Sequence, residues 1–330
     1  MGDAKYDVLG IGNAIVDVLA RVDDAFLDQE GLSKGGMALI DSDRAAELYA
    51  AIEPERELSG GSAANTMVGV SHLGGKTAFV GKVSNDLLGD TFRQELLLSG
   101  VAFLTPEANS GPATAQCVVL VTPDAQRTMN TFLGASIHVG PDDVEQQTVA
   151  DSQITYLEGY LWDLEPAKEA FLKAAKLAHQ ENRSVALSLS DSFCVDRHRA
   201  SFCQFVREHV DILFANEDEI KALYQRDAFE EAVSAAREDC TVAALTRGAQ
   251  GAVVIAEGVQ HEIGADAVHQ VVDTTGAGDL FAAGFLYGYT HGLSPETSGC
   301  IGAAVAADII SQYGARPERS LREVAARHLP

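Results

Sequence analysis

The chain has 330 residues, of which 46% are hydrophobic and 22% charged, and this composition is typical of a globular protein with one large domain and a smaller appendage. A formal net charge of -24 would repel nucleic-acid phosphates and anionic lipids, which argues against nucleic-acid or membrane binding. Five cysteines without a C-x-x-C pair indicate neither a zinc site nor a disulfide framework, and together with an amino terminus that lacks an apolar stretch they predict a cytoplasmic protein.

Short β-branched runs alternate with helical patterns along much of the chain. The runs lie at 6–9, 77–80, 185–189, 212–214, 242–245 and 253–256, and residues 166–180 and 229–237 have the apolar spacing of amphipathic helices. This alternation is typical of a parallel sheet with right-handed crossovers. We therefore predict a three-layer, doubly wound α/β fold with a mostly parallel sheet, and ligands at the carboxyl ends of its strands.

Two stretches break the alternation. Residues 13–41 and 113–133 have strand and turn patterns without a partner helix. We predict that they form one small β-sheet that folds over a ligand as a lid. The predicted large domain, residues 1–12, 42–112 and 134–330, then holds the nucleotide and the catalytic groups.

A pair of glycines follows the first predicted strand. Gly10 and Gly12 invite comparison with the dinucleotide-binding motif G-x-G-x-x-G, but Ile15 stands where the third glycine is required, and a strand pattern follows instead of a helix. A nicotinamide-dependent enzyme is therefore disfavoured. Asn13 and Asp17 fit better as hydrogen-bonding groups for vicinal hydroxyls, with a structural turn as the alternative.

A second glycine pair, Gly60 and Gly61, precedes a predicted helix that runs to about residue 73. Glycines permit close backbone approach to a ligand, and the side-chain amide of Asn65 could bond a sugar hydroxyl from the first turn. A glycine-rich helix start is also a common packing device. By itself this motif is weak evidence for a site.

The strongest motif is Asp273-Thr-Thr-Gly-Ala-Gly-Asp279, directly before a predicted helix at 280–289. Its small residues allow main-chain N–H groups to surround an anion, and the helix dipole favours negative charge there. The Asp279 carboxylate could accept a proton from an attacking hydroxyl while those amides hold a transferring phosphoryl group. A tight turn with an acidic first helical turn is the alternative. We predict an ATP-dependent kinase with Asp279 as the base.

Polar residues follow two more predicted strands. Asn216 and Glu219 come after 212–214, and Thr246 and Gly248 come after 242–245. Both positions lie where an α/β sheet binds ligands. An acid there could hold Mg²⁺ through water, although a charged helix start needs no metal.

These motifs, in this order, resemble the ribokinase (PfkB) family of carbohydrate and nucleoside kinases over nearly the whole chain. Residues 60–65 and 273–279 resemble the two family signatures, and Asn216 with Glu219 resembles its N-x-x-E element. Within the family, the three residues between Asn13 and Asp17 are similar to the spacing in adenosine kinases. The resemblance implies a ribokinase-like fold with ATP and Mg²⁺ as cofactors.

The resemblance also implies the reaction and its residues. The implied reaction is direct in-line phosphorylation of the 5′-hydroxyl of adenosine to AMP, as in purine salvage; the alternative is another nucleoside or a free sugar such as ribose, fructose or another hexose. The implied residues are Asp279, Gly276, Ala277, Gly278 and the lid residue Arg127 for catalysis; Asn13, Asp17, Leu39, Gly60, Gly61, Asn65 and Leu161 for the substrate; Asn216, Thr246 and Gly248 for the nucleotide; Asn216 and Glu219 for Mg²⁺ through water; and the main chain of Asp273 and Thr275 for a monovalent cation such as K⁺.

Two questions stay open at this level. The chain is compatible with a monomer or with a homodimer formed through the lid. A nucleoside-binding regulator without turnover is an alternative of another class, against which the intact Asp279 argues.

Overall fold

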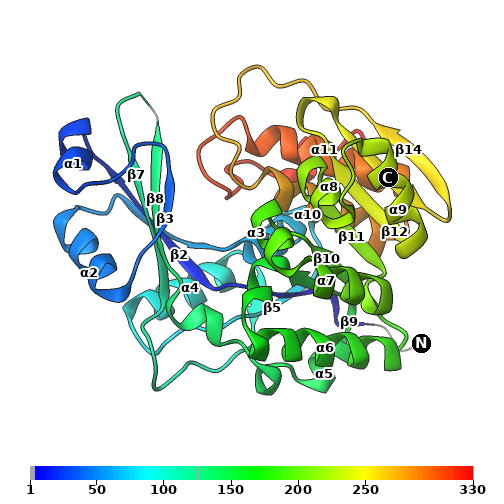
Figure 1. Ribbon diagram of the computed structural model, residues 1–330, viewed down its shortest axis with the longest axis horizontal. Coiled ribbons are helices and arrows are strands. Elements are labelled where there is room, and N and C mark those ends of the chain that lie inside the picture. Colours follow the sequence, from blue (N-terminus) through cyan, green and yellow to red (C-terminus); the bar gives the residue numbers. More distant parts are fainter. Residues whose placement is uncertain (1–3, 125, 330) are drawn as a thin grey trace.

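The computed structural model describes residues 4–124 and 126–329 and contains two β-sheets (Figure 1). The larger sheet has nine strands, and their spatial order is β14 (Val259–Ile263), β13 (Ala252–Ala256), β12 (Val242–Thr246), β11 (Ile212–Asn216), β10 (Ser184–Ser188), β9 (Ser152–Glu158), β1 (Tyr6–Ile11), β5 (Thr77–Val80) and β6 (Val101–Phe103). Only the pairs β12–β13 and β13–β14 are antiparallel. The predicted mostly parallel sheet is confirmed.

Helices cover both faces of this sheet because alternate strand residues are apolar on both sides. On β1, Val8 packs into one core and Leu9 and Ile11 pack into the other. The first core lies under α3 (Ser62–Leu73), α4 (Leu87–Leu98), α10 (Ala277–Thr290), α11 (Pro295–Ile309) and α12 (Leu321–Val324). The second lies under α5 (Gln146–Ala150), α6 (Glu165–Gln180), α7 (Ser192–His209), α8 (Glu217–Tyr224) and α9 (Phe229–Asp239). The three-layer architecture is therefore as predicted.

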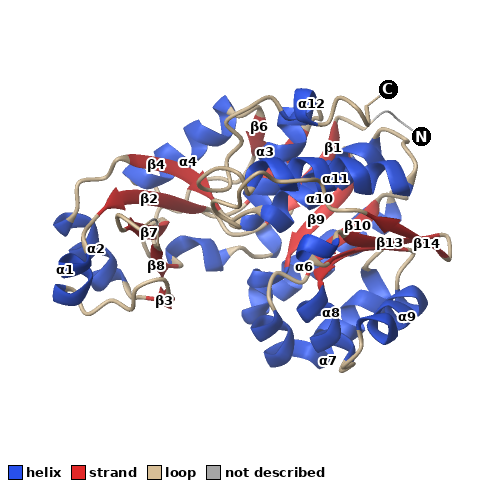
Figure 2. Ribbon diagram, turned by 90° about the horizontal axis from the view of Figure 1, so that it is seen from above, coloured by secondary structure: helices blue, strands red, loops and turns tan. Residues whose placement is uncertain are grey.

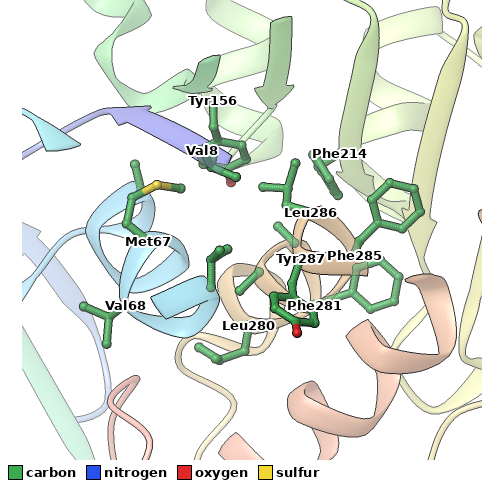
Figure 3. Close-up of a cluster of buried hydrophobic side chains, with 14 of the residues drawn as sticks. Val8, Met67, Val68, Tyr156, Phe214, Leu280, Phe281, Phe285, Leu286 and Tyr287 are labelled. Carbon is green, nitrogen blue, oxygen red and sulfur yellow. The ribbon is translucent and has the colours of Figure 1, made fainter. Parts of the chain in front are cut away.

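Two central helices, α3 and α10, begin within the two glycine motifs. Figure 3 shows Met67 and Val68 of α3 beside Leu280 of α10, beneath Val8 and Tyr156 of the sheet. All five side chains are at most 1% exposed. This packing fixes the amino-terminal ends of α3 and α10 relative to each other.

The smaller sheet stands to one side of the main body (Figure 2). Its five strands are, in spatial order, β3 (Met37–Leu39), β8 (Arg127–Phe132), β7 (Ala115–Val121), β2 (Ile15–Arg21) and β4 (Arg56–Gly60). On one face, Val118 and Leu120 pack with Leu27 of α1 (Asp24–Gln29) and Leu48 of α2 (Ser42–Ala51). On the other face, Asp17, Val119 and Met129 point towards the main body.

The smaller sheet uses more of the chain than the sequence predicts. Strand β4 pairs antiparallel with β2, and α2 packs on the same sheet, although the predicted division assigns residues 42–112 to the large domain. Helix α1 lies in a stretch for which no helix is expected. β4 has the sequence RELSG without a β-branched residue, so its pairing with β2, and not its own propensity, makes it a strand.

None of the helices in the two described ranges combines the length and the apolar character needed to cross a lipid bilayer.

Candidate active site

A cavity of about 380 Å³ lies at the carboxyl ends of β10, β11 and β12, between the start of α10 and the smaller sheet. Residues from both sheets and both glycine motifs line it. The predicted residues among them are Asp17, Gly61, Asn65, Arg127, Asn216, Glu219, Thr246, Thr275, Gly276, Ala277, Gly278 and Asp279. Its position at the strand ends is the one expected for a ligand site of an α/β sheet.

Asp279 lies in the first turn of α10 and is held by the start of α3. Its Oδ1 accepts a hydrogen bond from Ser62 Oγ at 2.6 Å, and its Oδ2 accepts one from Asn65 Nδ2 at 2.9 Å. Burial raises the pKa of Asp279, while these two bonds and the charge of Arg316 lower it. The carboxylate is therefore fixed in place and suited to accept a proton.

Gly276 caps α10 in a conformation that favours glycine. Its φ is 79°, and a Cβ at this position would lie 2.5 Å from Ala315 Cβ. Gly278, two residues later, faces open space in which a Cβ would meet nothing within 4 Å. The main chain between them thus borders the cavity without a side chain in the way, as an anion-binding loop requires.

At the start of α3, Gly61 also has a backbone conformation that favours glycine. Gly61 has a φ of 94°, and a Cβ there would lie 2.2 Å from the main-chain oxygen of Asn13. Asn65, four residues on, is 6% exposed, and its Oδ1 has no hydrogen-bond partner in the described part of the chain. A buried acceptor of this kind gains from a ligand that donates a hydrogen bond.

Asp17 reaches the cavity from β2. Burial raises its pKa to about 6, and the nearby charges of Arg316 and Arg127 lower it in part. Gly60 leaves room for this carboxyl group, because a Cβ on Gly60 would lie 2.5 Å from Asp17 Oδ2. Asp17 can accept hydrogen bonds from hydroxyl groups of a ligand.

Arg127 links the smaller sheet to the anion loop. It forms an ion pair with Asp273, and its Nη1 lies 3.4 Å from Thr275 Oγ1. Asp273 Oδ1 also accepts from Thr275 N at 3.0 Å, and Oδ2 accepts from Gly314 N at 2.8 Å. Since this carboxylate is already engaged by donors, a monovalent cation here would have to use main-chain oxygens, and K⁺ binding stays a prediction.

Asn216 and Glu219 form a capping box at the start of α8. Glu219 Oε2 accepts from Asn216 N at 2.9 Å, and Asn216 Oδ1 accepts from Glu219 N at 2.9 Å. Burial raises the pKa of Glu219 to about 7. Within the two described ranges, no cluster of three or more His, Cys, Asp or Glu side chains forms a metal site. Glu219 is the single carboxylate that this capping box contributes to the cavity, and a single carboxylate fits Mg²⁺ that is held mainly by water and nucleotide phosphates.

A second, largely apolar cavity of about 670 Å³ adjoins the first. It is lined by Gly248, by Val268 and Val271, and by small residues of α11. Thr246, Thr274, Ala277, Gly278 and Phe281 line both cavities. An apolar pocket that reaches the anion loop suits the base of a nucleotide whose phosphates lie at the start of α10.

Four predicted substrate residues lie outside the first cavity, as far as the described residues define it: Asn13, Leu39, Gly60 and Leu161. The amide of Asn13 is buried and bonded to Glu158 and Ser136. Leu39 is 64% exposed on the edge strand β3. The 3₁₀-helix Gly159–Asp163 turns Leu161 into the core and leaves Tyr160 at the cavity.

Several lining residues are not among the predicted ones. Ser62 directly follows the glycine pair, and Cys117, Val119 and Met129 lie on the cavity-facing side of β7 and β8. Successive side chains of a strand point to opposite faces of the sheet. Because Val118 and Leu120 face α1 and α2, this alternation would have identified Cys117, Val119 and Met129 as residues of the cavity-facing side. Arg316 has no local motif that could have identified it.

Glu158 is a buried acid beside the site, and its pKa is shifted by burial. It is 1% exposed, and it accepts hydrogen bonds from Asn13 Nδ2 at 2.6 Å and Ala63 N at 2.8 Å. Burial raises its pKa from 4.5 to about 7. Because the folded pKa lies above the unfolded one, the stability that Glu158 contributes is present below pH 4.5 and lost as the pH rises through 7.

We therefore expect Glu158→Gln to change the pH dependence of stability. Relative to the variant, the wild type should lose about 3 kcal/mol of unfolding free energy between acidic and mildly alkaline pH. Urea unfolding of both proteins across this range measures the difference. Parallel curves would contradict the raised pKa.

Comparison with known proteins gives consistent matches. The family model described as pfkB family carbohydrate kinase matches residues 39–320. The crystal structure of adenosine kinase from Sinorhizobium meliloti is 49% identical, with a TM-score of 0.89 and coverage of 99% of this chain and 100% of that chain. A probable sugar kinase from Rhizobium etli CFN 42 is 48% identical, with a TM-score of 0.89 and 98% coverage of both chains.

Guanosine-inosine kinase of Escherichia coli K12 is 28% identical over 227 residues, which are 66% of this chain and 52% of that protein. The chain thus spans about half the length of this relative. The names of these relatives differ in the acceptor, which is a purine nucleoside in two cases and a sugar in the third.

Proposed function

The chain belongs to the pfkB family of carbohydrate kinases and is an ATP-dependent phosphotransferase, and we propose that it transfers the γ-phosphoryl group of ATP directly to the 5′-hydroxyl of adenosine. The family implies ATP as donor and typically Mg²⁺. We further propose the residue roles given below, a cytoplasmic location and the use of K⁺. The chain is compatible with a monomer or with a homodimer formed through the smaller sheet.

The observation that carries this proposal is the position of Asp279 in the first cavity, directly after Gly278, which lines both cavities. Its carboxylate is fixed by Ser62 and Asn65 beside the open main chain of Gly278. A hydroxyl group bound there faces a proton acceptor, while the amides of the loop can stabilise charge on the phosphoryl group. Mg²⁺ bound with the nucleotide would neutralise phosphate charge, with Glu219 and Asn216 ordering its water ligands.

The wall of the first cavity supports a nucleoside as acceptor. Asp17 and Asn65 offer acceptors for ribose hydroxyls, whereas Val119, Met129 and Tyr160 give the same cavity an apolar side. A heteroaromatic base gains from apolar contact that a free sugar does not need. The 49% identity to an adenosine kinase over 99% of the chain favours adenosine.

A panel of acceptors tests the substrate. We expect adenosine to give the highest kcat/KM when ADP release is followed with adenosine, inosine, guanosine, ribose and hexoses in Mg²⁺ and ATP. Higher kcat/KM for inosine or guanosine would move the proposal to another nucleoside. Preference for ribose or a hexose, the acceptor class named for the R. etli protein, would reject a nucleoside kinase.

Ser62→Ala tests whether Asp279 acts as a base. The Ser62 hydrogen bond lowers the pKa of Asp279, so its loss raises that pKa, and the acid limb of kcat/KM should move to higher pH. The rate on the alkaline plateau should fall less than the rate at acidic pH. Ser234→Ala is a matched control, because Ser234 is exposed and its Oγ donates to the main-chain oxygen of Glu230 within α9. An unmoved acid limb in Ser62→Ala would contradict the assignment.

A further inference from the structure

A short segment near the carboxyl terminus contacts both glycine loops. Gly314 N donates to Asp273 Oδ2 at 2.8 Å, and Ala315 fills the space in which a Cβ of Gly276 would lie. The next residue, Arg316, extends to the other loop. Residues 314–316 therefore form a bridge between the anion loop, 273–279, and the loop at 59–64 that precedes and begins α3.

Arg316 donates to main-chain oxygens of that second loop and to the Ser59 hydroxyl. Its Nε donates to Ser59 O at 2.8 Å, its Nη1 donates to Ala64 O at 3.3 Å, and its Nη2 donates to Ser59 Oγ at 2.9 Å and also to Ser59 O. These acceptors lie on either side of Gly60 and Gly61. Since glycine has a large conformational freedom, a planar donor with several N–H groups is an effective way to fix the loop.

The charge of Arg316 interacts with two of the three acids that line the first cavity, Asp17 and Asp279. Its charged neighbours are Asp17 on β2, Asp279 on α10, Glu95 on α4 and the titratable His72 on α3. Burial lowers the pKa of Arg316 to about 10, so it stays cationic at neutral pH. The Asp279 charge raises the pKa of Asp17, and the Arg316 charge lowers the pKa of both acids.

We propose that Arg316 is a positioning residue for phosphoryl transfer: it holds the loop at 59–64 in place and keeps a positive charge in the cavity that it lines together with Asp17 and Asn65. The inference rests on the proposed function, because it assigns the acceptor to Asp17, Gly61 and Asn65 and the proton to Asp279. Arg316 touches neither substrate in this arrangement. It acts through the main chain of Ser59 and Ala64 and through its charge.

Two substitutions separate these actions. Arg316→Gln removes the charge and the fork of donors, whereas Arg316→Lys keeps the charge but cannot reproduce the fork. Arg322→Gln is a matched control, because Arg322 is an exposed arginine on the neighbouring helix α12. Each protein is assayed with the acceptor that the wild type uses best. A wrong acceptor assignment is then detected with the wild-type protein by itself, and the comparison of variants tests only the role of Arg316.

For Arg316→Gln we expect the acceptor KM to rise roughly 10- to 100-fold, with less change in the KM for ATP, and the acid limb of kcat/KM to move to higher pH. Arg316→Lys should keep the acid limb near that of the wild type while the acceptor KM stays raised. Arg322→Gln should match the wild type in both. Calorimetric binding of the acceptor without ATP should weaken in parallel with KM.

Thermal unfolding of all variants identifies a merely structural role. If Arg316→Gln lowers Tm and kcat together while the acceptor KM and the acid limb stay unchanged, Arg316 is only a brace and the proposal is wrong. The same conclusion follows if Arg316→Gln equals the wild type in acceptor KM and in pH profile.

Discussion

Replacing Asp279 by asparagine should lower kcat by about 10² to 10⁴-fold while acceptor binding is retained. Asparagine has nearly the same size, and its Oδ1 can still accept the bond from Ser62. Its amide can donate to Asn65 Oδ1, which has no other partner in the described ranges, once that side chain flips. The flipped Asn65 then presents its amide N–H to the ligand, whose hydroxyl can accept as well as donate a hydrogen bond. The fold of the site and acceptor binding are thus preserved, and the main loss is that of the proton acceptor.

Single-turnover rates and calorimetric acceptor binding measure the two effects separately. Asp90→Asn is a matched control, since Asp90 is an exposed aspartate in the first turn of another helix, α4, and its replacement should leave kcat unchanged. A kcat for Asp279→Asn within tenfold of the wild type would rule out Asp279 as the base.

Gly61→Ala should lower kcat/KM by roughly 100-fold or more, since a small displacement of binding groups is enough for a loss of that size. An alanine Cβ would lie 2.2 Å from the main-chain oxygen of Asn13, so the start of α3 must move. That movement would displace Ser62 and Asn65, which hold Asp279. Steady-state kinetics together with thermal unfolding measure the effect.

Backbone strain and displacement of the site can be distinguished. Gly111 has a φ of 105°, close to that of Gly61, but a Cβ there would meet nothing within 4 Å. Gly111→Ala should therefore lose stability by about 1–2 kcal/mol through strain alone and keep its kcat/KM. Equal kinetic losses in both variants would mean that Gly61 has no special place in the site.

Most of the large sheet could be predicted because most of its strands are buried on both faces. Continuous apolar runs such as 242–245 and 253–256 become β12 and β13 almost unchanged. The anion loop could be predicted because its chemistry is contained in seven consecutive residues. Strand β9 was not predicted: its sequence SQITYLE mixes polar and apolar residues, and its central place between β1 and β10 makes it a strand.

The remaining parts of the site depend on contacts that no local pattern reveals. Asn13 has the spacing of a ligand group, yet its amide bonds Glu158, which is 145 residues away in the chain. Arg316 reaches Ser59 across 257 residues. A polar residue near a glycine motif is therefore a candidate only, and its partner in the folded chain decides whether it faces the ligand or the core.

The bond between Ser62 and Asp279 joins residues 217 positions apart. During synthesis, α10 leaves the ribosome after all nine strands of the larger sheet, and the bridge at 314–316 follows later still. Loop closure over such separations is slow, so enzymatic turnover should be the last property to return on refolding. Recovered fluorescence or circular dichroism should precede it.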